Sequence, residues 1–156
     1  MSTPAQRLES DRAKYPALNV DEVLVWKAWL LLHQQEFDRF DYNYRIGDGS
    51  DPGPAFADNI RAMAIQLTQL RLDAVGWQGT IPTIFEVKRR AGPQNIGQLL
   101  TYDAVWRQKQ YTNANPRLRL VCSDFNSHLL PVIQVHDIQL DVVPVNFSVL
   151  ARPIVT

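Results

Sequence analysis

Three charged residues are spaced so that their side chains could act together chemically: Asp73, Glu86 and Lys88. Asp73 and Glu86 lie equally far from the midpoint of Gly79-Thr80, so a two-residue hairpin turn there would place them directly opposite each other. Glycine at the first turn position suits a type II′ turn, which needs a positive φ at that residue. The acid pair then falls at a non-hydrogen-bonded position, where Cβ atoms are about 4.5–5.5 Å apart. Lys88, two residues after Glu86, lies on the same face of its strand.

Two carboxylates at such a distance repel each other, and the pKa of each should rise unless a cation lies between them. Oxygen ligands favour a hard divalent cation, Mg²⁺ or Mn²⁺. Apolar residues flank the charges on both strands, as in central strands covered on two faces. They are Leu72, Ala74, Val75, Ile84, Phe85 and Val87. These residue types alone also fit a cross-strand ion-pair cluster in which Lys88 neutralises both acids.

The hairpin needs neighbouring elements to position it. Residues 1–18 are polar and read as a loosely held arm with a short helical turn around Gln6–Lys14. Asn19 and Glu22 fit a capping box, and apolar residues at helical spacing predict an amphipathic helix from there to about Phe37. Those apolar residues are Val20, Val23, Leu24, Ala28, Leu31 and Leu32, with Trp26 and Trp29 widening the face.

The remaining elements follow in the order strand, strand, strand, helix, strand. Residues 47–54 form a loop rich in glycine, proline and aspartate, and residues 55–70 are ambiguous between a short helical piece and an early strand from about Gln66. The expected ranges are strands 40–46, 67–77 and 82–89, a helix from Pro93 or Asn95 to about Lys109, strand 118–123, a helical turn near 127–130 and a short strand within 136–145. This order predicts an α/β fold, a mixed β-sheet flanked by helices, in one domain covering residues 19–156.

Composition narrows the function classes. At 156 residues with zero net charge, a nucleic-acid partner would need a local basic patch. The lone Cys122 excludes an internal disulfide and a cysteine cage for zinc. The sequence also lacks the G-x-S-x-G motif that would indicate a serine nucleophile. The polar N-terminus and the absence of a long apolar run lead us to expect a protein of a reducing, cytoplasmic compartment without a membrane span.

The residues Asp73, Glu86-Val87-Lys88, Gln98 and Tyr102 together resemble the PD-(D/E)XK nuclease superfamily. Gln98 and Tyr102 are similar to the Q-x-x-x-Y motif of its RecB-type branch. The resemblance covers roughly residues 20–124 and implies a restriction-endonuclease-like fold with an α-β-β-β-α-β core. The chain departs from the family pattern at Leu72, which stands where the motif has proline.

The resemblance implies a role for each residue. Asp73 and Glu86 would ligate the metal, aided by the backbone carbonyl of Val87, and Lys88 would orient the attacking water or stabilise the transition-state charge. Gln98 would hold the metal's water shell or the substrate phosphate, and Tyr102 fits either a catalytic role or a core aromatic residue.

Further candidates remain open between two interpretations. Glu22 or Glu36 would be the first-helix glutamate that reaches the metal in many family members, although the capping box also accounts for Glu22. Arg89 and Arg90 could clamp substrate phosphates or simply be solvated charges. Four other cations could extend that surface: Arg39, Arg45, Arg107 and Lys109.

The expected function is therefore that of a Mg²⁺- or Mn²⁺-dependent deoxyribonuclease, with endonuclease as the expected mode. The alternative is a structural or interaction component of a phage particle or DNA-packaging machinery that keeps the fold, because small stand-alone chains resembling this one are common in phages. The expected partner is DNA, with a homodimer or a larger phage assembly as the oligomeric state. A phage origin would place the chain in the host cytoplasm or the virion.

Overall fold

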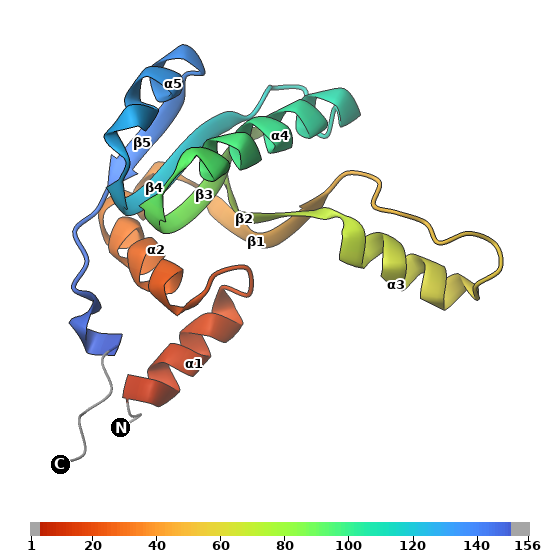
Figure 1. The fold of residues 1–156 in the computed structure, drawn as a ribbon, viewed down its shortest axis with the longest axis horizontal. Helices are drawn as coiled ribbons and strands as arrows, with labels where there is room; N and C mark the ends of the chain where they lie inside the picture. Colours follow the sequence, from red (N-terminus) through yellow and green to blue (C-terminus); the bar gives the residue numbers. More distant parts are fainter. Residues whose placement is uncertain (1–3, 151–156) are drawn as a thin grey trace.

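The hairpin of β2 (Leu70–Gln78) and β3 (Ile81–Ala91) forms the middle of a five-stranded sheet with the order β1-β2-β3-β4-β5 (Figure 1). The computed structural model describes residues 4–150. β1 (Arg39–Ile46) runs antiparallel to β2, whereas β4 (Arg117–Phe125) and β5 (Ile138–Val142) continue the sheet in parallel with β3. The predicted mixed α/β sheet is confirmed.

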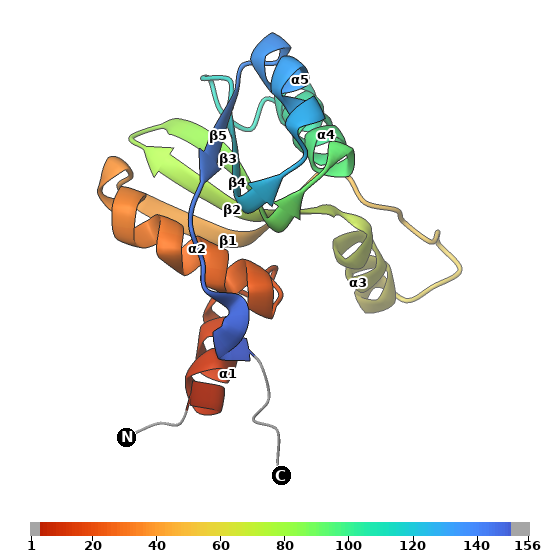
Figure 2. The same cartoon turned by 60° about the vertical axis from the view of Figure 1, so that its left-hand side comes forward.

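Helices cover both faces of this sheet (Figure 2). α2 (Val20–His33) packs one face, and its Trp26 and Trp29 stack at 4.8 Å and meet Phe85 of β3 in one core cluster. α4 (Pro93–Lys109) and α5 (Leu130–Val135) pack the other face. Short 3-10 turns complete the fold at Gln34–Glu36, Ser127–Leu129 and Phe147–Leu150.

The hairpin turn has the predicted geometry. The register pairs Gln78 with Ile81 and Ala74 with Phe85. Gly79 has a φ of 59°, and Thr80, also within the described part of the chain, does not have a positive φ, as a type II′ turn requires. A residue with a Cβ would be strained at position 79, so glycine fixes the register that aligns the two acids.

The N-terminal segment differs from the loosely held arm that the sequence predicts. Pro4–Lys14 is a helix, α1, and the residues after it, Tyr15 and Leu18, are buried. The Tyr15 ring contacts Tyr42 edge-on at 4.8 Å. Tyr15 and Leu18 are therefore part of the packed core and anchor the polar segment that carries them. Residues 1–3 lie outside the described residues.

Two further predictions change. The helical piece favoured within residues 55–70 is confirmed as α3 (Asp58–Thr68), but β2 begins at Leu70 instead of near Gln66. The first long helix ends at His33 instead of near Phe37. Within it, Leu31 and Leu32 are exposed, although helical spacing predicted that they lie on the packing face. No helix among residues 4–150 combines the length and the apolar character needed to span a bilayer.

The β1–β2 pair turns over at one point. Asn43 has a φ of 53°. At this residue the regular alternation of side chains between the two faces of the sheet is interrupted. Tyr42 packs with the α2-side core, whereas Tyr44, two residues later, packs with the α4-side core. Beyond this point the two strands lead away from the body to the loop 47–57 and to α3, which projects from the sheet (Figure 1).

Candidate active site

The predicted site residues gather around one cavity of about 430 Å³. Its lining includes five of the predicted residues, contributed by β2, β3 and α4: Asp73, Glu86, Lys88, Gln98 and Tyr102. We call this space the acidic cavity. The connection between α1 and α2 forms another wall through Pro16–Asn19. The convergence of Asp73 and Glu86 on one space, expected from the hairpin symmetry, is what the structure shows.

Asp73 is held at the end of the regular β2–β3 ladder. The regular cross-strand pairs run from Gln78–Ile81 to Ala74–Phe85. Asp73 lies one residue beyond the last of these pairs, away from the turn. The Asp73 carboxylate then accepts a hydrogen bond from the Val87 backbone N–H at 2.8 Å. A side-chain oxygen thus takes the place of a strand carbonyl, which keeps the carboxylate beside Glu86.

Glu86 is only 2% exposed and is held by a residue that the sequence analysis missed. The buried Asn95 amide donates to Glu86 at 3.4 Å and to Gln98 Oε1 at 3.1 Å. Its oxygen accepts from the Gly92 backbone N–H at 2.8 Å, at the start of α4. Asn95 therefore ties the helix start to two residues of the acidic cavity. An asparagine near a helix start reads as a cap in sequence, so its contact with Glu86 carried no sequence signal.

Lys88 contacts one acid closely. Its ammonium lies 2.8 Å from Glu22 Oε1 and 3.9 Å from Glu86 Oε1. The other Glu22 oxygen accepts from the Asn19 backbone N–H at 3.0 Å, and the Asn19 side chain accepts from the Glu22 backbone N–H at 2.9 Å. The predicted capping box is confirmed, and Glu22 also positions the lysine. Its role as a metal ligand stays a prediction, and Glu36 lies instead against Arg119 and His33.

The electrostatics of the acid pair are unbalanced. Burial, followed by the charge of Glu22, raises the pKa of Asp73 despite the Val87 hydrogen bond. Burial, followed by the charge of Asp73, raises the pKa of Glu86. Burial alone would lower the pKa of Lys88, but its bond with Glu22 and the neighbouring acids raise it. Lys88 is thus a firm cation committed to Glu22, and it does not neutralise both acids.

The donor set of the acidic cavity suits a hard divalent ion. Within residues 4–150, the His, Cys, Asp and Glu side chains do not gather in threes suited to hold a metal. Asp73 and Glu86 supply two carboxylates, with the Gln98 amide beside them. Mg²⁺ keeps several water ligands and is commonly bound by one or two carboxylates. The residues present therefore fit Mg²⁺ or Mn²⁺, and the Val87 carbonyl stays a predicted ligand.

The cations at the acidic cavity are not those that the sequence indicated. Arg12 of α1 and Arg71 of β2 line it. Arg89 and Arg90 line a different cavity of about 540 Å³, where Arg89 stacks on Phe147 at 4.0 Å. The four further cations bind elsewhere: Arg39 to Asp41, Arg45 to the Gln66 carbonyl, Arg107 to Asp103 and Lys109 to Asp48.

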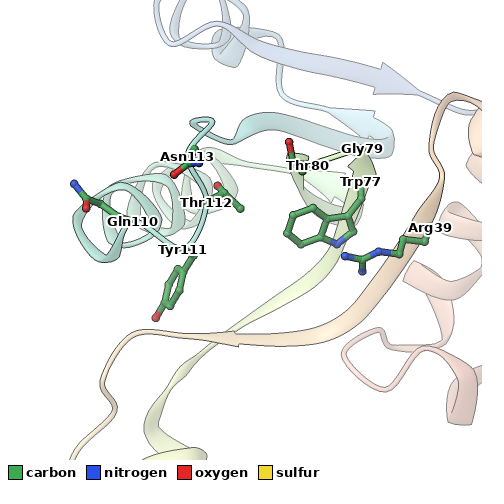
Figure 3. A pocket seen from close by; sticks show the side chains of 8 residues that line it. All are labelled: Arg39, Trp77, Gly79, Thr80, Gln110, Tyr111, Thr112 and Asn113. Atoms are coloured by element: carbon green, nitrogen blue, oxygen red, sulfur yellow. The ribbon is translucent and has the colours of Figure 1, made fainter.

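A third cavity, of about 470 Å³, lies at the turn end of the hairpin (Figure 3). The Arg39 guanidinium lies 4.6 Å from the centre of the Trp77 ring, and Tyr111 lines the same space. Its described lining contains no carboxylate side chain. The acid pair and its chemistry therefore belong to the acidic cavity alone of these three.

The fold is a mixed α/β sheet in the order β1-β2-β3-β4-β5, with α2 and α4 on opposite faces (Figure 2). Among solved structures, the fold is similar to that of a repair endonuclease from Pyrococcus abyssi, with a TM-score of 0.50 and 13% sequence identity over 80% of this chain and 47% of that one. A complex of EndoMS with double-stranded DNA matches at a TM-score of 0.49 and 12% identity, over 81% of this chain and 46% of that one. The chain thus spans about half the length of these two proteins.

No family model matches the sequence, and no curated protein matches it either. At this level of identity, the structural similarity shows the fold alone.

Proposed function

We propose that this chain is a Mg²⁺- or Mn²⁺-dependent deoxyribonuclease that hydrolyses phosphodiester bonds within DNA. The observation that carries the proposal is the acidic cavity, where Asp73 and Glu86 converge and the pKa of each is raised although Lys88 lies beside them. The similarity of the fold to a structure described as a repair endonuclease supports it, although fold alone does not fix function.

Each side chain has a defined task in this reaction. Asp73 and Glu86 hold the divalent ion, which when bound polarises the phosphodiester and lowers the pKa of the attacking water. The Lys88 ammonium, fixed at 2.8 Å from Glu22, donates a hydrogen bond to that water or to the phosphoryl oxygens, on which negative charge develops. The water attacks directly, so the chain forms no covalent intermediate.

Substrate positioning comes from the rim of the acidic cavity. Arg12 and Arg71 approach it from two different elements, α1 and β2, and would contact phosphates on either side of the scissile bond. Each phosphate neutralised in this way adds about 0.9 to the slope of log affinity against log salt for duplex DNA. Asn95 holds both Glu86 and Gln98 in place.

The test is metal-dependent cleavage of supercoiled plasmid DNA, which has no ends and therefore reports endonuclease activity. We expect cleavage with Mg²⁺ or Mn²⁺ and none with EDTA. Asp73→Asn, Glu86→Gln and Lys88→Met should each reduce the rate at least about 100-fold, as is typical for the loss of a group that stabilises the transition state. Matched controls are Asp103→Asn and Lys27→Met, whose side chains lie in ion pairs with Arg107 and Asp11; both should keep the parent rate.

Calorimetric titration with Mn²⁺ provides a second readout that does not depend on turnover. The parent should bind the ion, and Glu86→Gln should bind it at least tenfold more weakly. Equal cleavage by the parent and the site variants would disprove the assignment of the site. A parent that binds no divalent ion and cuts no form of DNA would disprove the nuclease. The phage-particle alternative stays a prediction.

A further inference from the structure

The helix α3 exposes a row of large apolar side chains. Phe56, just before the helix, is 52% exposed, and Ile60, Met63 and Leu67 are 43%, 55% and 66% exposed. Ile60, Met63 and Leu67, three and four residues apart, lie along one side of the helix, and Phe56 lies just before the N-cap of the helix. We call these four residues the apolar stripe. α3 projects from the sheet, and both ends of the described chain lie near α1, far from it (Figure 1).

The opposite side of α3 is already covered. Arg61 forms two hydrogen bonds with Asp51 of the preceding loop, at 2.6 and 3.0 Å. The Ser50 backbone N–H donates to Thr68 Oγ1 at 2.6 Å. Gly49 brings the loop so close that a Cβ there would lie 2.2 Å from the Ile65 carbonyl. Polar contacts thus fix the orientation of α3, and the apolar stripe faces away from them.

The spacing of the apolar stripe is the same read in either direction. The midpoint lies between Arg61 and Ala62, so a two-fold axis there places Phe56 of one copy against Leu67 of the other. The same axis places Ile60 against Met63. A two-fold interface must be complementary to itself, and this row of residues meets that condition as an antiparallel helix pair.

Charge and area agree with a second copy as the occupant. The residues flanking the apolar stripe on the helix, Asn59, Ala64 and Gln66, are uncharged, and the whole chain has zero net charge. Two copies therefore meet without like-charge repulsion. Large side chains exposed by about half offer roughly 400 Å² per copy, or about 800 Å² in a pair, which is the size of a weak interface and below that of a permanent dimer.

We propose that the apolar stripe binds the same stripe of a second copy, antiparallel, in a weak two-fold dimer. This proposal does not depend on the nuclease function, because α3 contributes no residue to the acidic cavity.

The first experiment is sedimentation of the full chain from about 1 μM to about 1 mM, a range that covers weak association. We expect the apparent mass to rise toward twice that of one chain. Met63→Lys and Leu67→Lys should keep the chain monomeric throughout, with unchanged circular dichroism because both side chains are exposed. Leu31→Lys is the matched control, since Leu31 is 85% exposed on α2 and should leave dimerisation unchanged.

The second experiment tests the register. A chain carrying Phe56→Cys and one carrying Leu67→Cys are treated with a short bis-maleimide, separately and as a mixture, since two copies of either position alone would lie about 16 Å apart along the helix pair. The mixture should cross-link at least several-fold faster than either alone, because the two positions face each other across the axis; Cys122 is buried and gives little background. A chain that stays monomeric at every concentration would refute the proposal. So would dimerisation that persists in both lysine variants, or equal cross-linking in all three samples.

Discussion

Two groups of charged residues, each built around a buried charged side chain of the sheet, differ in how their charge is balanced. Arg119, 4% exposed, lies 2.6 Å from Asp141 and 3.2 Å from Glu36. Its guanidinium also lies 5.0 Å from the Trp29 ring. We call these residues the Arg119 cluster. Burial alone would raise the pKa of Glu36, but hydrogen bonds from His33 and Arg119 outweigh it and lower the pKa.

The acidic cavity shows the opposite balance. Lys88 forms its close ion pair with Glu22 at 2.8 Å and lies 3.9 Å from Glu86, and the pKa of both Asp73 and Glu86 rises. Burial of a carboxylate therefore does not mark a functional site by itself. What distinguishes the two groups is the balance of charge: Arg119 and His33 lower the pKa of Glu36, whereas the pKa of Asp73 and that of Glu86 stay raised beside Lys88.

The largest change in stability is expected when the counter-charge is removed from the Arg119 cluster. Arg119→Met should lower the free energy of unfolding by about 3–5 kcal/mol, because Asp141 and Glu36 would lose their buried partner. Urea denaturation at pH 7 measures this difference. Adding Asp141→Asn to Arg119→Met should recover part of the loss. Equal stability of Arg119→Met and the parent would remove the basis of the comparison.

Removing one charge from the Asp73–Glu86 pair should stabilise the protein, whereas Arg119→Met should destabilise it. With both folded-state pKa values raised, the folded protein holds protons more tightly than the unfolded chain, so stability falls as the pH rises from the ordinary carboxyl range to above the raised values. Glu86→Gln, without metal, should therefore increase the free energy of unfolding at pH 8 by about 2 kcal/mol, or about 4–8 °C in Tm. At pH 4 it should change little.

Urea denaturation at both pH values in EDTA checks this prediction. Mg²⁺ should stabilise the parent at pH 8 and leave Glu86→Gln nearly unchanged. A variant no more stable than the parent at pH 8 would show that the pair is balanced after all.

The smallest effect concerns the positioning of the pair. Asn95→Ala should weaken Mn²⁺ binding about tenfold, because Glu86 and Gln98 would lose a shared hydrogen-bond donor. A merely structural role would lower stability without changing the affinity for the ion. The exposed Asn113→Ala is the control and should bind Mn²⁺ as the parent does. Unchanged affinity in Asn95→Ala would contradict the positioning role.

Local chemistry made part of the fold predictable. Gly79 and the equal spacing of Asp73 and Glu86 specify the turn and its register, and Asn19 with Glu22 specifies a helix start. Pro93, which suits a first helical turn, marks where α4 begins. These signals act over a few residues, so they can be read without knowledge of the surroundings.

Features that depend on distant contacts were not predictable in this way. Asparagine tolerates a positive φ but does not require one. The interruption of the side-chain alternation at Asn43 could therefore not be predicted from the residue type. α1 has a polar sequence, and it belongs to the site only because Tyr15 and Leu18 anchor it and bring Arg12 to the acidic cavity. The contact of Asn95 with Glu86 likewise exists only once α4 has folded back against β3.

The pairing of Ile46 with Leu70 places the exit and the return of the chain side by side at the end of the β1–β2 ladder. Everything between them is an insertion whose length does not alter the strand register. Evolution, or a protein engineer, could shorten or exchange this segment for a simple reverse turn and leave the carboxylates where they are. The surface that α3 presents can in this way be changed without moving the acidic cavity.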